Sequence, residues 1–419
     1  MLERTEAHPP NLTVKIAVFL QYYHTPDCPT AARPYALVER LGQDHDVTVV
    51  TTRTWEDRRR AHQFPWAPSG VNLVRFDVPY DNTMSAAQRL ASFLNYAARA
   101  VRYGLQMPRP DLILGSSTPL TAAAAAATVA QIRDIPWIFE LRDLWPAFPI
   151  QMGAVPDYGL HGLLRGGEAA LYRSADRVVT LSTDMERHVR ETAPTARTTT
   201  LEYGADFNLI GAIDRKQQTS LRERFSLDRR LLVLYAGSFG RANAIPTLLK
   251  AARRLTAERS DLHVAFAGGG HHEPKIRRAA RRQDAIRLLP PLAYPETLAL
   301  FDCADLSLVS FIDRPVLAAN SPGKFFDSLA TGTPVVVTNP GWTKRFVERH
   351  ACGWYVPPGS PDALAQCVAS VLESPDERTA ASQNAREIAR QRFVRSETMD
   401  RYAALVERVK RDHRLADRG

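Results

Sequence analysis

Short apolar runs alternate with helical patterns through the first half of the chain. The apolar runs have the length and continuity of buried strands and cover residues 13–20, 46–52, 71–78, 111–117, 136–141 and 177–182. Amphipathic or alanine-rich stretches that predict helices lie between several of them, at 31–42, 85–103, 119–133 and 161–173. Because such strands are apolar on both faces, the pattern predicts a parallel sheet with helices on both sides.

The same alternation starts again after a polar segment at residues 208–230, which predicts a linker with one short helix. The second series of strand runs covers 231–237, 263–269, 285–289, 306–310 and 334–338. Helical patterns follow at 244–258, 273–282, 294–302 and 323–331, and the chain closes with helical segments at 361–373, 375–392 and 396–414. The sequence therefore predicts a second α/β domain of the same kind.

A chain of 419 residues is long enough for two domains of ordinary size. We expect two Rossmann-like, doubly wound parallel-sheet domains, at residues 1–207 and 208–395, and a final helix at 396–419 that crosses back towards the first domain. Ligands of open parallel sheets bind outside the carboxyl ends of the strands. Two such sheets that face each other across a cleft suit an enzyme with one substrate in each domain.

The charge and cysteine content narrow the classes of partner. The chain has 54 basic and 45 acidic residues, a net charge of +9 that is compatible with nucleic acid, an anionic membrane or phosphorylated substrates. No basic tract interleaved with aromatic residues and no DNA-binding motif is present, so we predict no nucleic-acid partner. The sequence has no run of about 20 apolar residues and no signal-peptide core at the N-terminus, so we expect a cytoplasmic protein. Scattered spacing predicts free thiols at Cys28, Cys303, Cys352 and Cys367.

A glycine-bearing turn opens the second domain, where the strand run ending at Ala236 is followed by Gly237, Ser238, Phe239 and Gly240. A turn from a strand into a helix exposes backbone N–H groups at the positive end of the helix, which is a general anion site. Glycine also allows a phosphate to approach the backbone closely. The segment is neither a complete dinucleotide fingerprint nor a Walker loop, so an ordinary strand-to-helix turn stays open as an alternative.

The segment SPGKFFDSLATGTP at residues 321–334 places Lys324 and Asp327 near the start of a predicted helix. A cation in the first turn opposes the helix dipole unless an anion binds nearby. Asp327 follows one turn later on the same side of the helix. The two side chains therefore suit a ligand with a phosphate for the lysine and a ribose diol for the carboxylate. The alternative is a surface ion pair between residues three apart.

The pattern P-x-K-F-F-D-x-L-A-x-G-x-P-V-V in this segment resembles the nucleotide-sugar motif of retaining glycosyltransferases of family 4, which have the GT-B fold. The closest likeness is to the bacterial branch of N-acetylfucosamine-transferase-like enzymes of polysaccharide assembly. The resemblance extends over nearly the whole chain, because further family segments follow in order, namely TVKIAVFLQYY, GSSTPLTAAAAA, PWIFELRDLWP, RSADRVVTLSTDMERHV, LEYGADF, LYAGSFG and ADLSLVSF.

The resemblance implies a role for each matching residue. Asp327 matches the ribose-binding acid, and Lys324 with Arg241 and the backbone N–H groups of Gly237 and Gly240 matches the donor diphosphate contacts. The base is expected at the strand end formed by Leu289 and Pro290, and the remaining donor-site residues are Ser238, Asn320, Ser321, Pro322 and Gly323. The catalytic candidates are Lys324, Arg241 and three residues on the acceptor side, Arg142, Asp143 and His24.

Four positions depart from the family pattern, and one of them is Asp327, a shorter acid where the second of two motif glutamates is usual. Ala319 stands where the first of two motif glutamates is usual, and Asn320 beside it is a candidate for part of the lost donor-sugar contact. Asn243-Ala244 replaces an expected Lys-Gly, and Thr30-Ala31-Ala32 replaces paired glycines after the first strand. The identity of the donor therefore cannot be copied from relatives.

The implied reaction is a retaining transfer of a hexose or N-acetylhexosamine from a nucleoside diphosphate, with UDP as the first candidate nucleotide. The acceptor is expected to be a saccharide, a polyprenyl-linked compound or a small-molecule natural product. The sequence has no Asp-x-Asp motif in a suitable context, so we expect no metal and no cofactor. A nucleotide-sugar epimerase of the same fold and a non-catalytic nucleotide-sugar-binding protein are the alternatives.

The predicted helix at 85–103 has an apolar stripe formed by Leu90, Phe93, Leu94, Ala97 and Val101, with three arginines away from it, Arg89, Arg99 and Arg102. A helix of this kind can lie on an anionic bilayer beside a lipid-linked acceptor. It can equally pack on its own sheet. Peripheral contact with the inner face of the cell membrane is therefore one of two open expectations.

Overall fold

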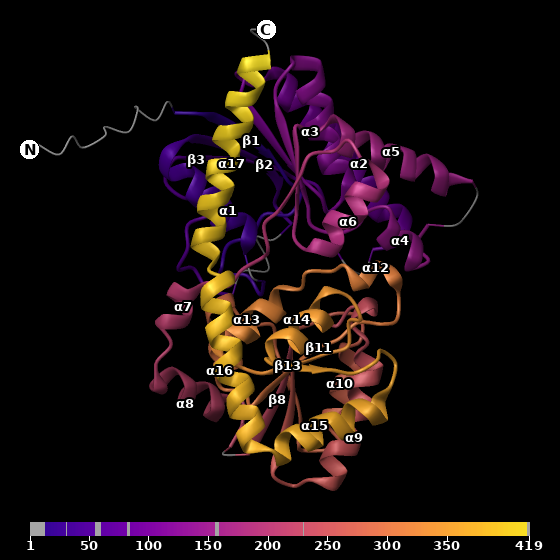
Figure 1. Cartoon of the computed structure of the whole chain (residues 1–419), viewed down its shortest axis with the longest axis vertical. Coiled ribbons are helices and arrows are strands. Elements are labelled where there is room, and N and C mark those ends of the chain that lie inside the picture. The colour runs from indigo at the N-terminus through magenta and orange to yellow at the C-terminus, as the bar shows by residue number, and fades with distance from the viewer. Residues whose placement is uncertain are drawn as a thin grey trace, which may run out of the picture.

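The chain folds into two parallel sheets, one above the other along the long axis, each with helices on both faces (Figure 1). The computed structural model describes residues 13–30, 32–54, 60–81, 84–155, 159–228 and 230–416. Both domains have the doubly wound arrangement that the alternation of strand and helix patterns predicts.

The first sheet has seven parallel strands in the order β3-β2-β1-β4-β5-β6-β7. The strands are β1 (Lys15–Phe19), β2 (Asp46–Thr52), β3 (Val71–Phe76), β4 (Leu112–Ser116), β5 (Trp137–Leu141), β6 (Arg177–Thr180) and β7 (Thr198–Thr200). The helices are α1 (Arg33–Asp44), α2 (Ala86–Gln106), α3 (Leu120–Arg133), α4 (Ala147–Gln151), α5 (Leu160–Ser174) and α6 (Thr183–Thr192). Every predicted strand run is present, whereas β7 was not predicted because its three threonines carry no apolar signal.

The second sheet has six parallel strands in the order β10-β9-β8-β11-β12-β13. The strands are β8 (Leu231–Ala236), β9 (Leu262–Ala267), β10 (Ile286–Leu289), β11 (Leu306–Val309), β12 (Val335–Val337) and β13 (Gly353–Tyr355). The helices that precede or cover this sheet are α7 (Phe207–Gly211), α8 (Arg215–Arg224), α9 (Ile245–Glu258), α10 (Glu273–Ala280), α11 (Tyr294–Asp302), α12 (Pro315–Ala318), α13 (Gly323–Thr331), α14 (Trp342–His350), α15 (Pro361–Glu373) and α16 (Pro375–Arg392). Sequence patterns did not predict β13, which is three residues long, or α14.

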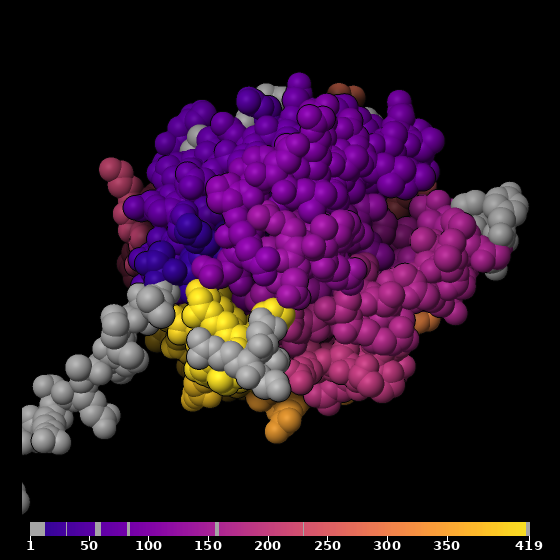
Figure 2. Space-filling model, turned by 90° about the horizontal axis from the view of Figure 1, so that it is seen from above, coloured from indigo at the N-terminus to yellow at the C-terminus, as the bar shows by residue number. Residues whose placement is uncertain are grey.

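The last helix, α17 (Arg395–Ala416), returns to the first domain as expected. It begins next to the second domain and runs along α1 (Figure 1). Its buried face, with Tyr402, Val406 and Val409, belongs to the same apolar cluster as Val38 and Leu41 of α1. Figure 2 shows the end of this helix, in yellow, lying against the first domain. The final helix therefore fastens the two domains together.

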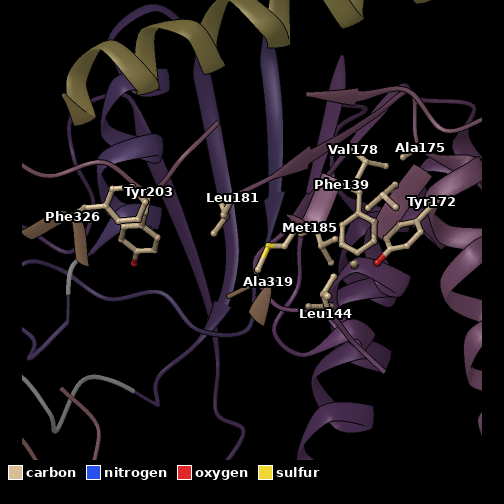
Figure 3. Packing of buried hydrophobic residues seen from close by; sticks show 14 of the residues in the cluster. Phe139, Leu144, Tyr172, Ala175, Val178, Leu181, Met185, Tyr203, Ala319 and Phe326 are labelled. Carbon is tan, nitrogen blue, oxygen red and sulfur yellow. The ribbon is translucent and has the colours of Figure 1, made fainter. Parts of the chain in front are cut away.

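The two domains also share a continuous apolar cluster. Leu181 and Met185 of the first domain lie in the same cluster as Ala319 and Phe326 of the second (Figure 3). Beside them, the Ser182 Oγ donates a hydrogen bond to the Ala319 carbonyl at 2.7 Å. The two domains are thus in direct contact at this point.

The predicted apolar stripe on α2 divides into two parts. Phe93 is buried together with Tyr96 and Ala100, so α2 packs on its own sheet. Leu90 and Leu94 are more than half exposed, at 54% and 55%, and so do not belong to that buried face. Among the described residues no helix is long and apolar enough to cross a bilayer. The four cysteines are free thiols, as predicted.

Candidate functional site

The glycine turn after β8 depends on two close backbone approaches. Gly237 has φ +139°, a conformation that other residues rarely adopt, and its N–H donates to the Ala267 carbonyl at 2.9 Å. A Cβ on Gly268 would lie only 2.0 Å from the Gly237 carbonyl oxygen. The ends of β8 and β9 therefore meet backbone to backbone. The Gly237 N–H, which we expected to face a phosphate, is already engaged within the fold.

Side chains hold the rest of this turn in place. The Ser238 carbonyl accepts hydrogen bonds from the Tyr235 hydroxyl at 2.8 Å and the Asn243 amide at 2.9 Å. Phe239 donates its N–H to the Gly269 carbonyl at 2.8 Å. A short 3₁₀ turn at Arg241–Asn243 separates the glycine turn from α9. Asn243, which replaces the expected lysine, thus fixes the shape of the turn and supplies no charge.

Lys324 lies directly against this turn. Its Cε and Nζ are 2.9 and 3.0 Å from the position that a Cβ on Gly237 would occupy. The Nζ donates to the Tyr235 hydroxyl at 3.1 Å and lies 4.4 Å from the centre of the Tyr235 ring. Burial lowers the pKa of Lys324 to about 8. No carboxylate of the described chain forms an ion pair with it, so the turn carries a positive charge that has no anion.

Asp327, one turn after Lys324, is buried, with 3% of its surface exposed. Its Oδ1 accepts a hydrogen bond from the Tyr294 hydroxyl at 2.8 Å. The same hydroxyl accepts one from Arg395 Nη2, also at 2.8 Å. Burial raises the pKa of Asp327 to about 7, while the charge of Arg395 and the hydrogen bond from Tyr294 act in the opposite direction. The alternative of a surface ion pair with Lys324 is therefore wrong.

The other predicted donor-side residues surround the turn. Arg241 is exposed, and its charge acts together with burial and the charge of Lys275 to lower the pKa of His272. The Leu289 carbonyl accepts the Gly268 N–H at 3.2 Å, which places the end of β10 beside the turn, and Pro290 follows it in an exposed position.

The segment 320–323 leads into α13. The Asn320 carbonyl accepts a hydrogen bond from the Trp342 indole at 2.8 Å. The Asn320 Oδ1 and the Ser321 Oγ are buried without a hydrogen-bond partner among the described residues. Pro322 caps α13 and Gly323 is its first residue. Two polar atoms next to Lys324 thus have hydrogen-bonding capacity that the chain itself does not use.

Ala319 does not face the same space as these two atoms. Its side chain is 7% exposed and belongs to the apolar cluster with Leu181 and Met185 of the first domain (Figure 3). Its carbonyl holds the Ser182 hydroxyl. The position of the missing motif glutamate is therefore part of the contact between the domains in this chain.

The acceptor-side candidates gather at the carboxyl ends of three first-domain strands. The Asp143 Oδ2 accepts a hydrogen bond from the Thr118 hydroxyl at 2.7 Å, and burial raises the pKa of Asp143. The Arg142 N–H donates to the Ser117 hydroxyl at 3.0 Å. His24 is 4% exposed, and burial together with the charge of Arg142 lowers its pKa to about 3, so its ring is neutral near pH 7. His24 is therefore a buried, neutral member of this cluster, and its role on the acceptor side stays a prediction.

Sequence reasoning missed four polar residues of these two clusters, Ser117, Thr118, Tyr294 and Arg395. Ser117 and Thr118 lie in a segment that carries the family resemblance. The position of this segment directly after a predicted strand was the signal that could have identified them. Tyr294 and Arg395 reach Asp327 from α11 and α17 through contacts that no local pattern indicates. Of the expected paired-glycine positions, Ala31 lies outside the described residues, and Ala32 has φ +44°.

Two family models match the chain in succession. The model described as "Glycosyl transferase 4-like domain" matches residues 30–204, and "Glycosyl transferases group 1" matches residues 217–388. The probable glycosyltransferase WbjE of Pseudomonas aeruginosa is 22% identical over 351 residues, which cover 82% of this chain and 86% of that protein. A D-inositol 3-phosphate glycosyltransferase of Thermobispora bispora is 30% identical over 60% of this chain and 61% of its own length.

The solved structures that match share the fold across nearly the whole chain. The crystal structure of HepE from Anabaena in complex with UDP and glucose superimposes with a TM-score of 0.69 at 16% identity. The match covers 94% of this chain and 99% of HepE. With both domain models matched in order and two parallel-sheet domains in this arrangement, the chain belongs to the glycosyltransferases with the GT-B fold.

Proposed function

We propose that this glycosyltransferase transfers a sugar from a UDP-sugar, with retention of configuration and without a metal ion. The observation that carries the proposal is the position of Lys324, whose ammonium group lies against the Gly237 turn without an acidic partner in the described chain. A half-buried cation that has lost part of its hydration is stabilised when an anion arrives. A diphosphate bound at this turn would supply that anion.

The nucleoside part of the donor would extend from the turn towards Asp327. The described hydrogen bonds engage Oδ1 of this carboxylate, so Oδ2 is the oxygen for a ribose hydroxyl. The Leu289–Pro290 strand end lies on the neighbouring side of the turn, where the base would contact the backbone. UDP bound to HepE, a protein of the same fold, supports the choice of nucleotide.

The chemistry needs charge stabilisation more than it needs a protein base. As the glycosidic bond breaks, negative charge builds up on the departing diphosphate. Lys324 and Arg241 would stabilise it, together with the N–H groups of Ser238 and Gly240, which donate to no described backbone group. In a retaining transfer the acceptor attacks on the face that the diphosphate leaves, and a phosphate oxygen takes the acceptor proton.

The acceptor would bind against Arg142, Asp143 and His24 in the first domain. We propose a saccharide or a lipid-linked saccharide, because Leu90 and Leu94 form an exposed apolar pair on the same domain and Arg99 and Arg102 are exposed on the same helix. A protein made in the cytoplasm would then reach the inner face of the membrane. Sedimentation with anionic vesicles tests this, and a Leu90→Ser, Leu94→Ser variant that still sediments like the wild type would contradict it.

Incubation with a panel of UDP-hexoses and UDP-N-acetylhexosamines tests the proposed activity. A transferase without acceptor slowly hydrolyses its donor and releases UDP, and Lys324→Ala should slow that release by about 10²-fold or more. The matched control is Lys275→Ala, which removes an exposed lysine of the same domain. Interconversion of the sugars would instead indicate an epimerase, and neither reaction would indicate a binding protein.

A further inference from the structure

A buried arginine stands at the start of the returning helix. Arg395 is 3% exposed and is the first residue of α17. The described chain gives it no direct carboxylate partner within ion-pair distance. A buried cation without a compensating charge is costly, so the fold must balance it in another way.

The charge that balances Arg395 is that of Asp327, and the Tyr294 hydroxyl lies between the two side chains. Arg395 Nη2 donates to the Tyr294 hydroxyl oxygen, and the Tyr294 hydroxyl donates to Asp327 Oδ1, both at 2.8 Å. The guanidinium carbon also lies 5.1 Å from the centre of the Tyr294 ring. Arg395 of α17, Tyr294 of α11 and Asp327 of α13 thus form a chain of hydrogen bonds, called the relay below. It ends on the carboxylate of the candidate donor site.

We propose that Arg395 and Tyr294 are positioning residues for the donor site, which orient the Asp327 carboxylate and keep it ionised for the nucleotide. The inference rests on the proposed role of Asp327 in binding ribose. It assigns to the C-terminal helix a part in nucleotide affinity that is separate from its part in fastening the domains.

Among the charged groups around Asp327, Arg395 is the main source of positive potential at its carboxylate. From α7, the capping residue Asp206 adds a negative charge that favours the protonated form of Asp327. The strands β11 and β12 bring no titratable side chain, and Arg386 of α16 contacts the far end of α13 at the Thr331 carbonyl. Lys324, on the same helix, faces the glycine turn. Burial raises the pKa of Asp327 to about 7 even with Arg395 in place, so loss of the arginine should protonate it at neutral pH.

The backbone around Arg395 allows its side chain to be replaced without breaking the junction between the domains. The Arg395 N–H donates to the Ala205 carbonyl at 3.0 Å, and the Ala205 N–H donates to the Phe393 carbonyl at 2.8 Å. These bonds do not involve the guanidinium group. The side chain adds one bond of its own to this junction, from Nη2 to the Gly204 carbonyl at 3.0 Å.

The experiment is a titration of UDP binding against pH, between about pH 5.5 and about 9.5, by calorimetry. We expect Arg395→Gln to move the acid side of the affinity profile up by about one pH unit or more, because an adjacent guanidinium lowers a carboxyl pKa by that amount. Tyr294→Phe should move it in the same direction by less. Arg395→Lys keeps the charge and should restore most of the wild-type profile. Arg401→Gln, which removes an exposed arginine of the same helix, should leave the profile unchanged.

Two outcomes would separate this inference from the proposed function. If Asp327→Asn weakens UDP binding but Arg395→Gln and Tyr294→Phe keep the wild-type profile, the relay is overturned and the role of Asp327 stands. If Asp327→Asn binds UDP like the wild type, the role of Asp327 and the inference fail together. A lower melting temperature with an unmoved profile would show a purely structural role and also overturns the relay. Should Arg395→Gln not fold, Tyr294→Phe, which deletes a single oxygen, decides the question alone.

Discussion

Lys324 packs against the glycine turn, and its side chain occupies the space that any side chain at position 237 would need. The Lys324 Cε lies 2.9 Å from the site of an absent Gly237 Cβ, and the Gly237 backbone has φ +139°. One glycine therefore serves both the turn and the placement of the cation. This contact links the two motifs that the sequence shows separately.

Gly237→Ala should displace Lys324 and strain the turn. We expect a loss of stability of about 1–3 kcal/mol from the unfavourable backbone conformation, together with at least tenfold weaker UDP binding. Chemical denaturation and calorimetry measure the two effects. The control is Gly166→Ala in α5, where a Cβ meets nothing within 4 Å and should be neutral or slightly stabilising. Wild-type UDP affinity in Gly237→Ala would show that this contact does not place the lysine.

The affinity for UDP should peak in a narrow pH range between about 7 and about 8. Burial raises the pKa of Asp327 to about 7, so its binding form is lost as the pH falls through that value. Burial lowers the pKa of Lys324 to about 8, so its charge is lost as the pH rises above that value. Asp327→Asn should remove the protein's acid limb and leave only the ionisation of the UDP phosphate, near pH 6. A flat profile across this range would contradict both assignments.

Asp327→Asn should also stabilise the folded protein at high pH. An acid whose pKa is raised on folding lowers the free energy of unfolding when it is ionised. This penalty is absent below the pKa of the unfolded state, near 4, and grows as the pH rises. It is complete above the pKa of the folded state, about 7. The pKa of about 7 already includes the attraction of Arg395, which only partly offsets the effect of burial, so the neutral amide still avoids a net penalty. We expect a higher melting temperature than the wild type at pH 8 and no difference near pH 4. A lower melting temperature for the variant at pH 8 would show that the ionised carboxylate stabilises the fold.

Ala319→Glu, which restores the family glutamate, should not improve activity. The Ala319 side chain is 7% exposed among Leu181 and Met185, so a carboxylate there would enter an apolar contact between the domains. We expect destabilisation of about 1–3 kcal/mol and reduced turnover. A variant with raised turnover and unchanged stability would place residue 319 beside the donor sugar after all.

Sequence patterns predicted every strand with an apolar run, including the three-residue β12, and missed β7 and β13, which are equally short. These short strands depend on hydrogen bonds to a neighbouring strand, β6 for β7 and β12 for β13. The spacing of apolar residues along the chain does not indicate such pairing. At the candidate site, the local signals indicate Lys324 and Asp327, because their spacing and their helix position are visible in one segment; their roles stay predictions. Tyr294, Arg395 and Thr118 reach the site through tertiary contacts. The burial of Ala319 and His24 likewise follows from how the domains pack.

We propose that Lys324 stabilises the transition state more than it binds the donor. Its pKa is lowered by burial, and among the described side chains its hydrogen bond goes to the neutral Tyr235 hydroxyl, so its charge is incompletely compensated before the donor binds. The attraction strengthens as the diphosphate gains charge during bond cleavage, and such an interaction raises turnover.

Steady-state kinetics of Lys324→Ala, with the donor identified from the UDP-sugar panel, test this claim most directly. We predict that kcat falls about 10²-fold or more, the scale for removing one preorganised donor, while the KM for the donor changes much less. Lys275→Ala should retain both constants. A Lys324→Ala enzyme with wild-type kcat and only a raised KM would show that the lysine holds the donor without contributing to catalysis, and would contradict the account.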